Sequence, residues 1–457
     1  MCGIVGGVAE RNLVPVLLEG LRRLEYRGYD SSGIAALNRK SELNRVRSLG
    51  KIKNLEEKIA QTEPGFTGGC AIGHTRWATH GVPSENNAHP HMSNNQVTIV
   101  HNGIIENYQQ LKSNQEQQGY RFESETDTEV IAHAVHYHFQ NTQDLYAAVK
   151  QATLEFEGAY AIGVICKDEP DTLIAARKGS PLVIGVGIGE NFIASDVSAL
   201  LPVTQQFIFL EEGDIAKITR DNIAIFDADG NSVERAIKQS SLSSSAVELG
   251  NHKHYMHKEI YEQAQAVIDT LEGRITQESV LVSSFGVNAE AIFSTVKQVQ
   301  IIACGTSYHA GLVAKYWFED ILRLPCQVEV ASEFRYRNPV LQDNTLFVTI
   351  SQSGETADTF AALQQVNQLK QSLNIVTLSI CNVAESSLTR ESDLVYLTQA
   401  GPEIGVASTK AFTTQLVVLA LLMTALGKVQ KSMETAQEKR IIAGLHKLPK
   451  LINKALE

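Results

Sequence analysis

The sequence predicts two domains of different fold class, an α+β domain with layered sheets followed by an α/β domain with a parallel sheet. Up to about residue 230, short apolar segments rich in β-branched and aromatic residues end at Gly or Asp-Gly, the pattern of strands. Helical spacing of apolar residues interrupts this set at 13–24, and T-D-T-E at Thr126 matches a capping box that would start another helix. Strands and helices in separate groups favour layered α+β packing.

The pattern changes after a serine-rich stretch at 240–245, which we interpret as a linker. Beyond it, strand-like segments alternate with long helical stretches, as in βαβ units whose parallel sheet is wrapped by helices. These strand-like segments lie at 299–303, 345–350, 374–380 and 394–398.

Composition narrows the class of protein and its compartment. The 457 residues suffice for about two or three domains, and 40 basic against 51 acidic residues give a net charge of −11, which disfavours a nucleic-acid binder. Glu10 and Arg11 argue against a signal peptide, and the longest apolar run, 416–423, is far shorter than the roughly 18 residues of a membrane helix. Six cysteines without paired spacing indicate reduced thiols, so we expect a cytoplasmic protein that is not in a membrane.

Cys2 follows the initiator methionine directly, so removal of Met1 would leave a residue with both a thiol and a free α-amine. The thiolate is the nucleophile, and an α-amine with a pKa of about 8 can take the thiol proton and later deliver it to a leaving group. A cysteine placed here by chance is the alternative, and the residue alone favours that alternative. The motifs around it reverse this preference.

Five strings along the first 130 residues accompany Cys2. They are C-G-I-V-G at Cys2, L-R-R-L-E-Y-R-G-Y-D-S at Leu21, G-H-T-R-W-A-T-H-G at Gly73, H-N-G-I-I-E-N at His101 and E-S-E-T-D-T-E at Glu123. In this order they resemble the class II glutamine amidotransferases, which are N-terminal-nucleophile hydrolases. The resemblance implies a layered αββα domain that hydrolyses glutamine.

The resemblance also implies a role for each site residue. Cys2 would be the nucleophile, and the side-chain amide of Asn102 with the backbone N–H of Gly103 would form the oxyanion hole that amide hydrolysis needs. Arg76 would bind the α-carboxylate of glutamine, which suits its planar fork, and Asp127 would pair with the α-ammonium.

Three further residues belong to the same predicted pocket. Trp77 would gate the passage of ammonia, and Thr79 and His80 would line its loop. Without the resemblance, several of the predicted site residues could have a purely structural role instead. The Asn-Gly pair could form a hairpin turn, Asp127 could be a first-turn residue favoured by the helix dipole, and Trp77 could be a core side chain.

Two strand-like segments of the second domain run into loops of small hydroxyl residues, I-I-A-C-G-T-S ending at Ser307 and S-Q-S-G-E-T starting at Ser351. Free N–H groups at a helix start favour an anion, although a simple N-cap is the alternative. Ligands of open parallel sheets bind beyond the carboxyl ends of strands, so two such loops favour a phosphate site. The loops resemble those of the sugar isomerase (SIS) domain, which implies a flavodoxin-like fold.

Two more strings, G-P-E-I-G-V-A-S-T-K-A-F at Gly401 and Y-M-H-K-E-I at Tyr255, resemble the glucosamine-6-phosphate synthase family. This resemblance covers the chain from end to end and implies contacts with a sugar phosphate. The residues it implies for the phosphate are Thr306, Ser307, Ser351, Gln352, Ser353 and Thr356, with Val406 and Ser408 touching the sugar.

The family resemblance divides the chain into a glutaminase domain (2–235), a linker (236–260), a first SIS domain (261–435) and a helical tail (436–457). It implies L-glutamine and fructose 6-phosphate as substrates, a homodimer, and no cofactor. The family continues into a second SIS domain with a catalytic glutamate and lysine, so we expect this chain to show glutaminase activity with weak or absent synthase activity. The histidines of N-H-K-H-Y-M-H match no zinc pattern, so we expect no metal.

Two other functions compete with this interpretation. An amidophosphoribosyltransferase shares the first domain but would need a phosphoribosyl-pyrophosphate domain in place of the serine-rich loops. A non-catalytic sugar-phosphate sensor could keep a SIS domain, but it would need neither Cys2 nor the predicted glutamine pocket.

Overall fold

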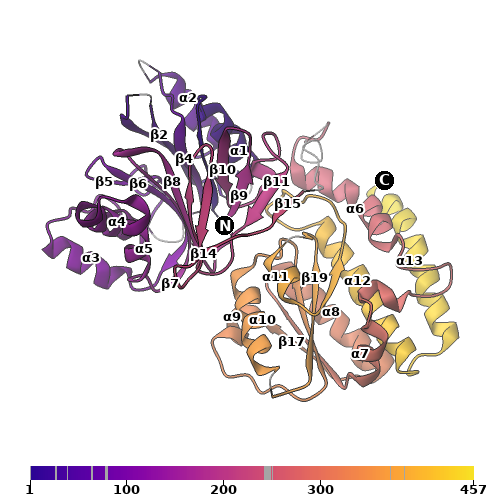
Figure 1. The fold of residues 1–457 in the computed structure, drawn as a ribbon. Coiled ribbons are helices and arrows are strands. Elements are labelled where there is room, and N and C mark those ends of the chain that lie inside the picture. Colours follow the sequence, from indigo (N-terminus) through magenta and orange to yellow (C-terminus); the bar gives the residue numbers. More distant parts are fainter. Residues whose placement is uncertain are drawn as a thin grey trace. The chain divides into compact units, whose positions relative to one another are not determined.

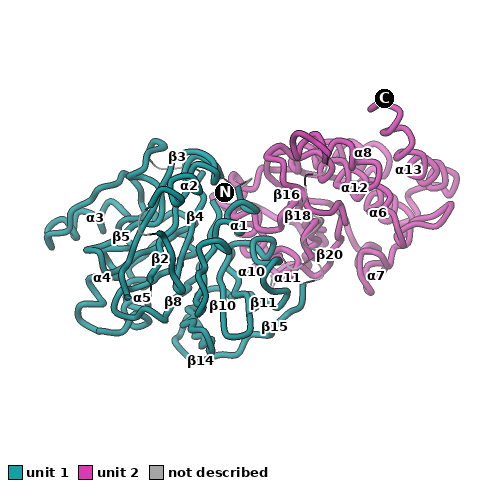
Figure 2. Tube along the Cα trace, turned by 90° about the horizontal axis from the view of Figure 1, so that it is seen from above, with its two compact units in different colours: residues 1–246 teal, residues 247–457 magenta. Residues whose placement is uncertain are grey.

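The computed structural model describes residues 2–25, 28–38, 40–62, 65–77, 81–240, 249, 251–370, 372–384 and 386–457. The chain divides into two compact units, Met1–Ala246 and Val247–Glu457 (Figure 2). Most of the serine-rich stretch predicted as a linker lies outside the described residues. Each unit is described by itself below.

The first sheet of unit 1 has β1 near its centre, and its strand order is β15-β11-β9-β10-β1-β4-β2-β3. All of its neighbouring strands pair antiparallel. Its strands are β1 (Gly3–Ala9), β2 (Ser31–Leu37), β3 (Leu43–Leu49), β4 (Cys70–Arg76), β9 (Val183–Val186), β10 (Glu190–Ala194), β11 (Gln206–Phe209) and β15 (Ile237–Gln239).

The second sheet of unit 1 is also antiparallel, in the order β14-β13-β12-β8-β7-β6-β5. Its strands are β5 (His91–Ser93), β6 (Val97–Ile105), β7 (Gly158–Cys166), β8 (Glu169–Lys178), β12 (Ile215–Ile218), β13 (Ile223–Phe226) and β14 (Ser232–Val233).

Helices cover the outer face of each sheet (Figure 1). Leu17 and Leu21 of α1 pack on the first sheet, whereas Ile131 and Val135 of α4 pack on the second. The helices of unit 1 are α1 (Val14–Leu24), α2 (Ile52–Ala60), α3 (Tyr108–Gln117), α4 (Glu129–Thr142), α5 (Leu145–Thr153) and the 3₁₀ helix η2 (Val197–Ala199).

A third core lies between the two sheets and joins apolar side chains from both. Because successive strand residues point to opposite faces, Ile4 and Val8 of β1 enter this core while Val5 packs under α1. Both faces of β1 are therefore buried, and the strand is apolar without alternation. The layers are α-β-β-α, which confirms the predicted αββα fold.

The expected start of α4 was wrong. The capping box predicted a helix beginning at Thr126, but α4 begins at Glu129, and Thr128 at its N-cap makes no side-chain capping bond. The Glu129 carboxylate instead accepts the N–H groups of Glu123 and Ser124. The capping-box motif correctly singled out Glu129 as a hydrogen-bond acceptor, but its carboxylate binds the segment before the helix and does not cap the helix. This happens because the chain before α4 folds back over Glu129.

The sheet of unit 2 is parallel, with strand order β17-β16-β18-β19-β20. Its strands are β16 (Gln298–Ala303), β17 (Cys326–Val330), β18 (Thr345–Ser351), β19 (Ile375–Cys381) and β20 (Leu394–Leu397). Numbered along the chain, the order is 2-1-3-4-5, the flavodoxin-like arrangement that was predicted. The sequence did not predict β17, a short edge strand with exposed or half-buried polar residues.

Helices lie on both faces of this sheet (Figure 1). Side chains of α8 and α12 build the core on one face, and those of α9 and α10 build the core on the other. The helices are α6 (Tyr255–Leu271), α7 (Ala289–Thr295), α8 (Gly305–Leu322), α9 (Ala331–Arg335), α10 (Ala357–Leu369), α11 (Ser387–Glu391), α12 (Lys410–Val429), α13 (Thr435–Leu456) and the 3₁₀ helix η4 (Val282–Phe285).

One described helix, α12, is long and apolar enough to cross a membrane by length and composition, with a mean hydropathy of 1.7. Within the structure, 67% of that hydropathy window is buried, and Val418, Leu422 and Leu426 are part of the core of unit 2. A core helix of a parallel-sheet domain accounts for this composition.

We expect Arg235→Ala to destabilise the first unit. Asp214 is fully buried, and Arg235 binds its carboxylate through Nε at 3.0 Å and Nη2 at 2.8 Å. Removing one partner of a buried pair leaves an uncompensated charge and costs about 3 kcal/mol of unfolding free energy. Urea unfolding measures this loss. Glu211→Ala removes only the exposed partner of Arg235 and should cost less than about 1 kcal/mol. Equal losses for the two variants would contradict the expectation.

Candidate functional site

Strand pairing places Cys2 beside the end of β4. β1 pairs antiparallel with β4, with Gly3 opposite Thr75, so the residue before β1 lies next to Arg76 and Trp77. The backbone N–H of Trp77 donates to Sγ of Cys2 at 3.3 Å, and Sγ lies 3.6 Å from the carbonyl oxygen of Trp77. The half-buried thiol is therefore held by backbone groups of the first sheet.

Asn102 comes to the same place from β6 of the second sheet. Its Nδ2 donates to the carbonyl oxygen of Cys2 at 3.2 Å. Nε2 of His74 lies 3.0 Å from Oδ1 of Asn102 and 3.0 Å from the carbonyl oxygen of His101. Because both neighbours are acceptors, this imidazole nitrogen carries the proton. His74 thereby fixes the amide with its oxygen inward and its NH₂ group toward Cys2.

Gly103 follows Asn102 inside β6, opposite Tyr160 of β7. The alternative of a hairpin turn at Asn-Gly was therefore wrong, since both residues lie within a strand. Gly103 has φ of +143°, and a Cβ there would overlap the carbonyl oxygen of Ala159. Only glycine satisfies this close approach of β6 and β7 next to Asn102.

Arg76 and Asp127 complete the charge environment of Cys2, and both side chains are buried. Burial raises the pKa of the Cys2 thiol, while the N–H of Trp77 and the charge of Arg76 act in the opposite direction and Asp127 adds to the rise. Oδ2 of Asp127 accepts the N–H of Ile105 at 2.8 Å. Asp127 precedes α4 instead of lying in its first turn, so the helix-dipole alternative was wrong.

Trp77 is 38% exposed, so the alternative of a core residue was wrong. Its ring makes an edge-to-face contact with Tyr29 at 5.8 Å between centroids. Thr79 and His80, which the sequence places in the same loop, lie outside the described residues.

A group of buried histidines lies behind Asn102. The rings of His74 and His89 stack at 4.0 Å, and His89 meets His91 at 4.8 Å. Burial lowers the pKa of His74 to about 3 and also lowers those of His89, His91 and His101. The group is neutral near pH 7. In the described part of the chain, Sγ of Cys2 bonds to Trp77 and to no imidazole.

The predicted phosphate loops meet at the carboxyl edge of the parallel sheet. Gly305–Ser307 follows β16. Ser351 is the last residue of β18, the strand that pairs with β16, and 352–356 follow it. These strands flank the point where the strand order reverses, and open α/β sheets bind ligands there. Thr306 and Ser307 lie in the first turn of α8, and Thr356 is the N-cap of α10 without a side-chain capping bond.

The second of these loops is tightly turned. Oγ of Ser351 accepts the N–H of Gly354 at 2.9 Å and lies 3.0 Å from Oγ1 of Thr356. Gly354 has φ of +68°, and Ser386 leaves no space for a Cβ. Ser353 accepts the N–H of Glu355, and the Gln352 carbonyl accepts that of Asn382. The hydroxyl groups of these loops and the N–H groups at the starts of α8 and α10 therefore lie at the carboxyl edge of the parallel sheet.

The third predicted segment follows β20. Oγ of Ser408 donates to Oε2 of Glu403 at 2.9 Å, and Val406 is exposed. Oε1 of Glu403 also accepts the N–H groups of Thr409 and Ala411, which caps α12. Lys410, to which the sequence assigned no role, pairs with Glu262 at 2.7 Å.

Sequence reasoning missed the residues that support the site. His74 and His101 lie within the quoted strings, but no role was assigned to them. Glu129 was given a capping role. Buried polar residues inside otherwise apolar strands were the available signal, because such residues need partners.

Two known domain families match separate parts of the chain. A glutamine amidotransferase domain matches residues 74–202, and a SIS domain matches residues 292–425. The glutamine–fructose-6-phosphate aminotransferase (isomerizing) of Pseudomonas aeruginosa is 55% identical over 456 residues, and that of Haemophilus influenzae is also 55% identical over 456 residues. Each alignment covers 100% of this chain and 74% of the relative.

A solved structure is similar over part of this chain. The C-terminal domain of glucosamine-fructose-6-phosphate aminotransferase from Francisella tularensis is 47% identical, with a TM-score of 0.43, over 45% of this chain and 57% of that one.

Fold, site and sequence define the class of protein: a glutamine-dependent amidotransferase that carries a SIS domain. Within that class, the chain belongs to the glutamine–fructose-6-phosphate aminotransferase (isomerizing) family.

The buried histidines predict a pH dependence of stability. Their folded pKa values lie below the unfolded value of about 6.5, so the unfolded chain binds more protons as the pH falls below that value. The unfolding free energy should therefore fall by up to about 1.4 kcal/mol per pH unit for each histidine. Urea unfolding at about pH 7.5 and about pH 5.5, with hydrogen exchange in unit 1 peptides, measures this slope. His89→Gln should reduce it, and equal stability at both pH values would contradict the expectation.

Proposed function

We propose that this chain hydrolyses glutamine through Cys2 and that the ammonia is used to convert fructose 6-phosphate into glucosamine 6-phosphate. The observation that carries the proposal is the convergence of Cys2, Asn102 and Trp77 from two facing sheets. Family membership supports fructose 6-phosphate as the sugar that accepts the ammonia, since relatives that are 55% identical are named glutamine–fructose-6-phosphate aminotransferases.

The proposed reaction starts when Met1 is removed and the α-amine of Cys2 becomes free. The amine takes the thiol proton, and Sγ attacks the side-chain carbonyl carbon of glutamine. Nδ2 of Asn102 and the N–H of Gly103 would stabilise the oxyanion. Collapse of the tetrahedral intermediate breaks the C–N bond, and the amine returns the proton to the departing ammonia. Water then hydrolyses the thioester to glutamate and regenerates the thiol.

Glutamine would be oriented by the two buried charges of the pocket. Arg76 would bind its α-carboxylate and Asp127 its α-ammonium, while Trp77 would gate the departing ammonia. Burial raises the strength of both charge-assisted contacts, because water competes less for the charges. Thr79 and His80 are proposed for the same pocket from the family resemblance.

Fructose 6-phosphate would bind at the carboxyl edge of the parallel sheet. Thr306 and Ser307 from one loop, with Ser351, Ser353 and Thr356 from the other, offer hydroxyls around two helix starts. Gln352 would add an amide, and Val406 and Ser408 would contact the sugar. The strand order supports this site, since the two loops flank the reversal of the sheet.

The compartment and assembly are also proposals. All six cysteines are free thiols, which favours the cytoplasm. We propose a homodimer from the family resemblance, which sedimentation equilibrium of the purified chain measures directly.

Cys2→Ala should abolish glutamate release and leave binding of fructose 6-phosphate intact, because the nucleophile is lost from one unit only. Asn102→Ala should keep the nucleophile and lower kcat by about 10²–10³-fold, the usual effect of losing one oxyanion donor. Glutamate release and calorimetric binding of the sugar phosphate measure both effects. Cys166→Ala, which removes a buried thiol at the end of β7, is the matched control and should keep activity. Continued glutamate release by Cys2→Ala would disprove the mechanism.

Ser351→Ala should weaken binding of fructose 6-phosphate by about ten-fold, since it removes a hydroxyl from the phosphate loop and the acceptor for the N–H of Gly354. Isothermal titration calorimetry measures the affinity. Ser379→Ala removes a buried hydroxyl of the neighbouring strand β19 and should leave the affinity unchanged. Equal effects of the two variants would argue against a phosphate site at Ser351.

A further inference from the structure

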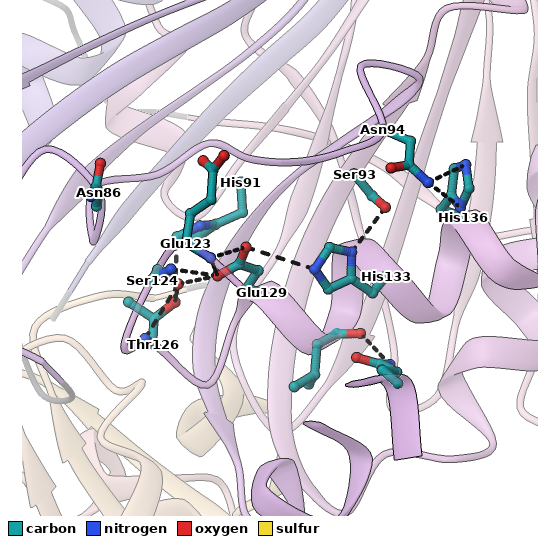
Figure 3. A network of polar contacts seen from close by, with 12 residues as sticks. Asn86, His91, Ser93, Asn94, Glu123, Ser124, Thr126, Glu129, His133 and His136 are labelled. Carbon is teal, nitrogen blue, oxygen red and sulfur yellow. Dashed lines mark hydrogen bonds and ion pairs between the residues drawn. The ribbon is translucent and has the colours of Figure 1, made fainter. Parts of the chain in front are cut away.

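The carboxylate of Glu129 holds the chain segment that precedes α4. Glu129 is the first residue of α4 and is 4% exposed. Its Oε1 accepts the N–H of Glu123 at 3.0 Å, and its Oε2 accepts both the N–H and the Oγ–H of Ser124 at 2.7 Å (Figure 3). One charged side chain therefore satisfies three donors of a segment that has no regular secondary structure.

The rest of this segment is tied down by hydroxyl groups. Oγ1 of Thr126 lies 3.0 Å from Oγ of Ser124 and 3.1 Å from Nε2 of His91 (Figure 3). Oγ1 of Thr128 lies 2.9 Å from Nδ1 of His101. Asp127 stands between these two threonines. The backbone of Asp127 is thus fixed on both sides. Glu129 holds the N-terminal end of the same turn at Glu123 and Ser124.

The Glu129 side chain also contacts His133 of the same helix. Nε2 of His133, one turn further along α4, lies 3.7 Å from Oε1 of Glu129, and Nδ1 of His133 lies 2.9 Å from Oγ of Ser93 (Figure 3). Burial would raise the pKa of Glu129, but the nearby imidazole of His133 and the hydrogen bonds from Ser124 and Glu123 outweigh it and lower the pKa to about 2. The carboxylate is therefore charged at neutral pH and accepts strong hydrogen bonds.

We infer that Glu129 is a positioning residue for substrate recognition: by holding Glu123 and Ser124 it fixes the turn that presents the Asp127 carboxylate to the α-ammonium of glutamine. The inference deepens the proposed function and rests on its assignment of Asp127. Asp127 uses Oδ2 for the N–H of Ile105, so its remaining acceptor capacity depends on where the turn places it. Glu129 touches no substrate and acts only through this turn.

The test compares glutamine with its des-amino analogue, 4-carbamoylbutanoate, which has the amide and carboxylate but no ammonium. Steady-state glutamate or glutarate release by the Met1-processed full chain gives kcat and KM for each. The wild type should prefer glutamine, and Asp127→Asn should lose that preference. Glu129→Gln puts an NH₂ group against the backbone donors, so the preference should fall by about ten-fold through KM for glutamine, with kcat within about two-fold.

Ser124→Ala is the milder variant, because it removes one donor and keeps the carboxylate. It should shift the preference in the same direction by a few-fold, and it decides the matter if Glu129→Gln does not fold. His136→Gln is the matched control. His136 is buried two turns along the same helix. Among the described residues it bonds to Tyr120, Asn94 and Gln140 and to no residue of 123–127, so its replacement should leave the preference unchanged.

Three results would contradict the inference, and each has a different meaning. If Glu129→Gln and Ser124→Ala lower kcat for both substrates equally and keep the preference, then Glu129 has a structural role only. If Asp127→Asn itself keeps the preference, then the assignment of Asp127 in the proposed function is wrong, and the inference falls with it. Additive effects of Asp127→Asn and Glu129→Gln in the double variant would also count against it, since residues acting through one contact are not additive.

Discussion

The pairing of β1 with β4 is the constraint on which the candidate active site depends. Cys2 has no secondary structure of its own, and it is placed only because the next residue, Gly3, lies opposite Thr75 in the ladder. A slip of one residue would turn Ile4 and Val8 out of the core between the sheets. The same burial that stabilises unit 1 therefore fixes where the thiol stands relative to Trp77.

Buried polar side chains add the groups that a thiol alone lacks. They come from the second sheet, from the start of α4 and, at His74, from β4 of the first sheet. Such groups are costly unless they are hydrogen-bonded, so each one requires a partner. His74 holds the amide of Asn102, His101 bonds to Thr128, and Glu129 holds 123–124. The result is a site whose donors are oriented before the substrate arrives, which is the arrangement that favours charge development.

In unit 2 the direction of the strands, and not the pairing of buried polar side chains, brings the candidate site residues together. In a parallel sheet all strands end at one edge, so the loops after β16 and β18 come together whatever their sequence. The chemistry then depends on small hydroxyl residues and on Gly354, whose positive φ allows the loop to turn sharply. The parallel sheet brings the loops together, and their small hydroxyl side chains supply hydrogen-bond donors of the kind that suit an anion.

The amino-acid sequence was enough to predict the two fold classes, and it pointed to Cys2 as a candidate nucleophile and to the hydroxyl loops, because apolar periodicity and short motifs are local. Tertiary structure decided the rest. It put the Asn-Gly pair inside β6, used Glu129 to hold a turn and not as part of a capping box, exposed Trp77, and added the edge strand β17. The contacts of Glu129 reach only five and six residues back, but they depend on how the chain folds before α4. The strand position of the Asn-Gly pair depends on a partner distant in sequence, since β6 pairs with β7. Local propensity carries no information about such pairing.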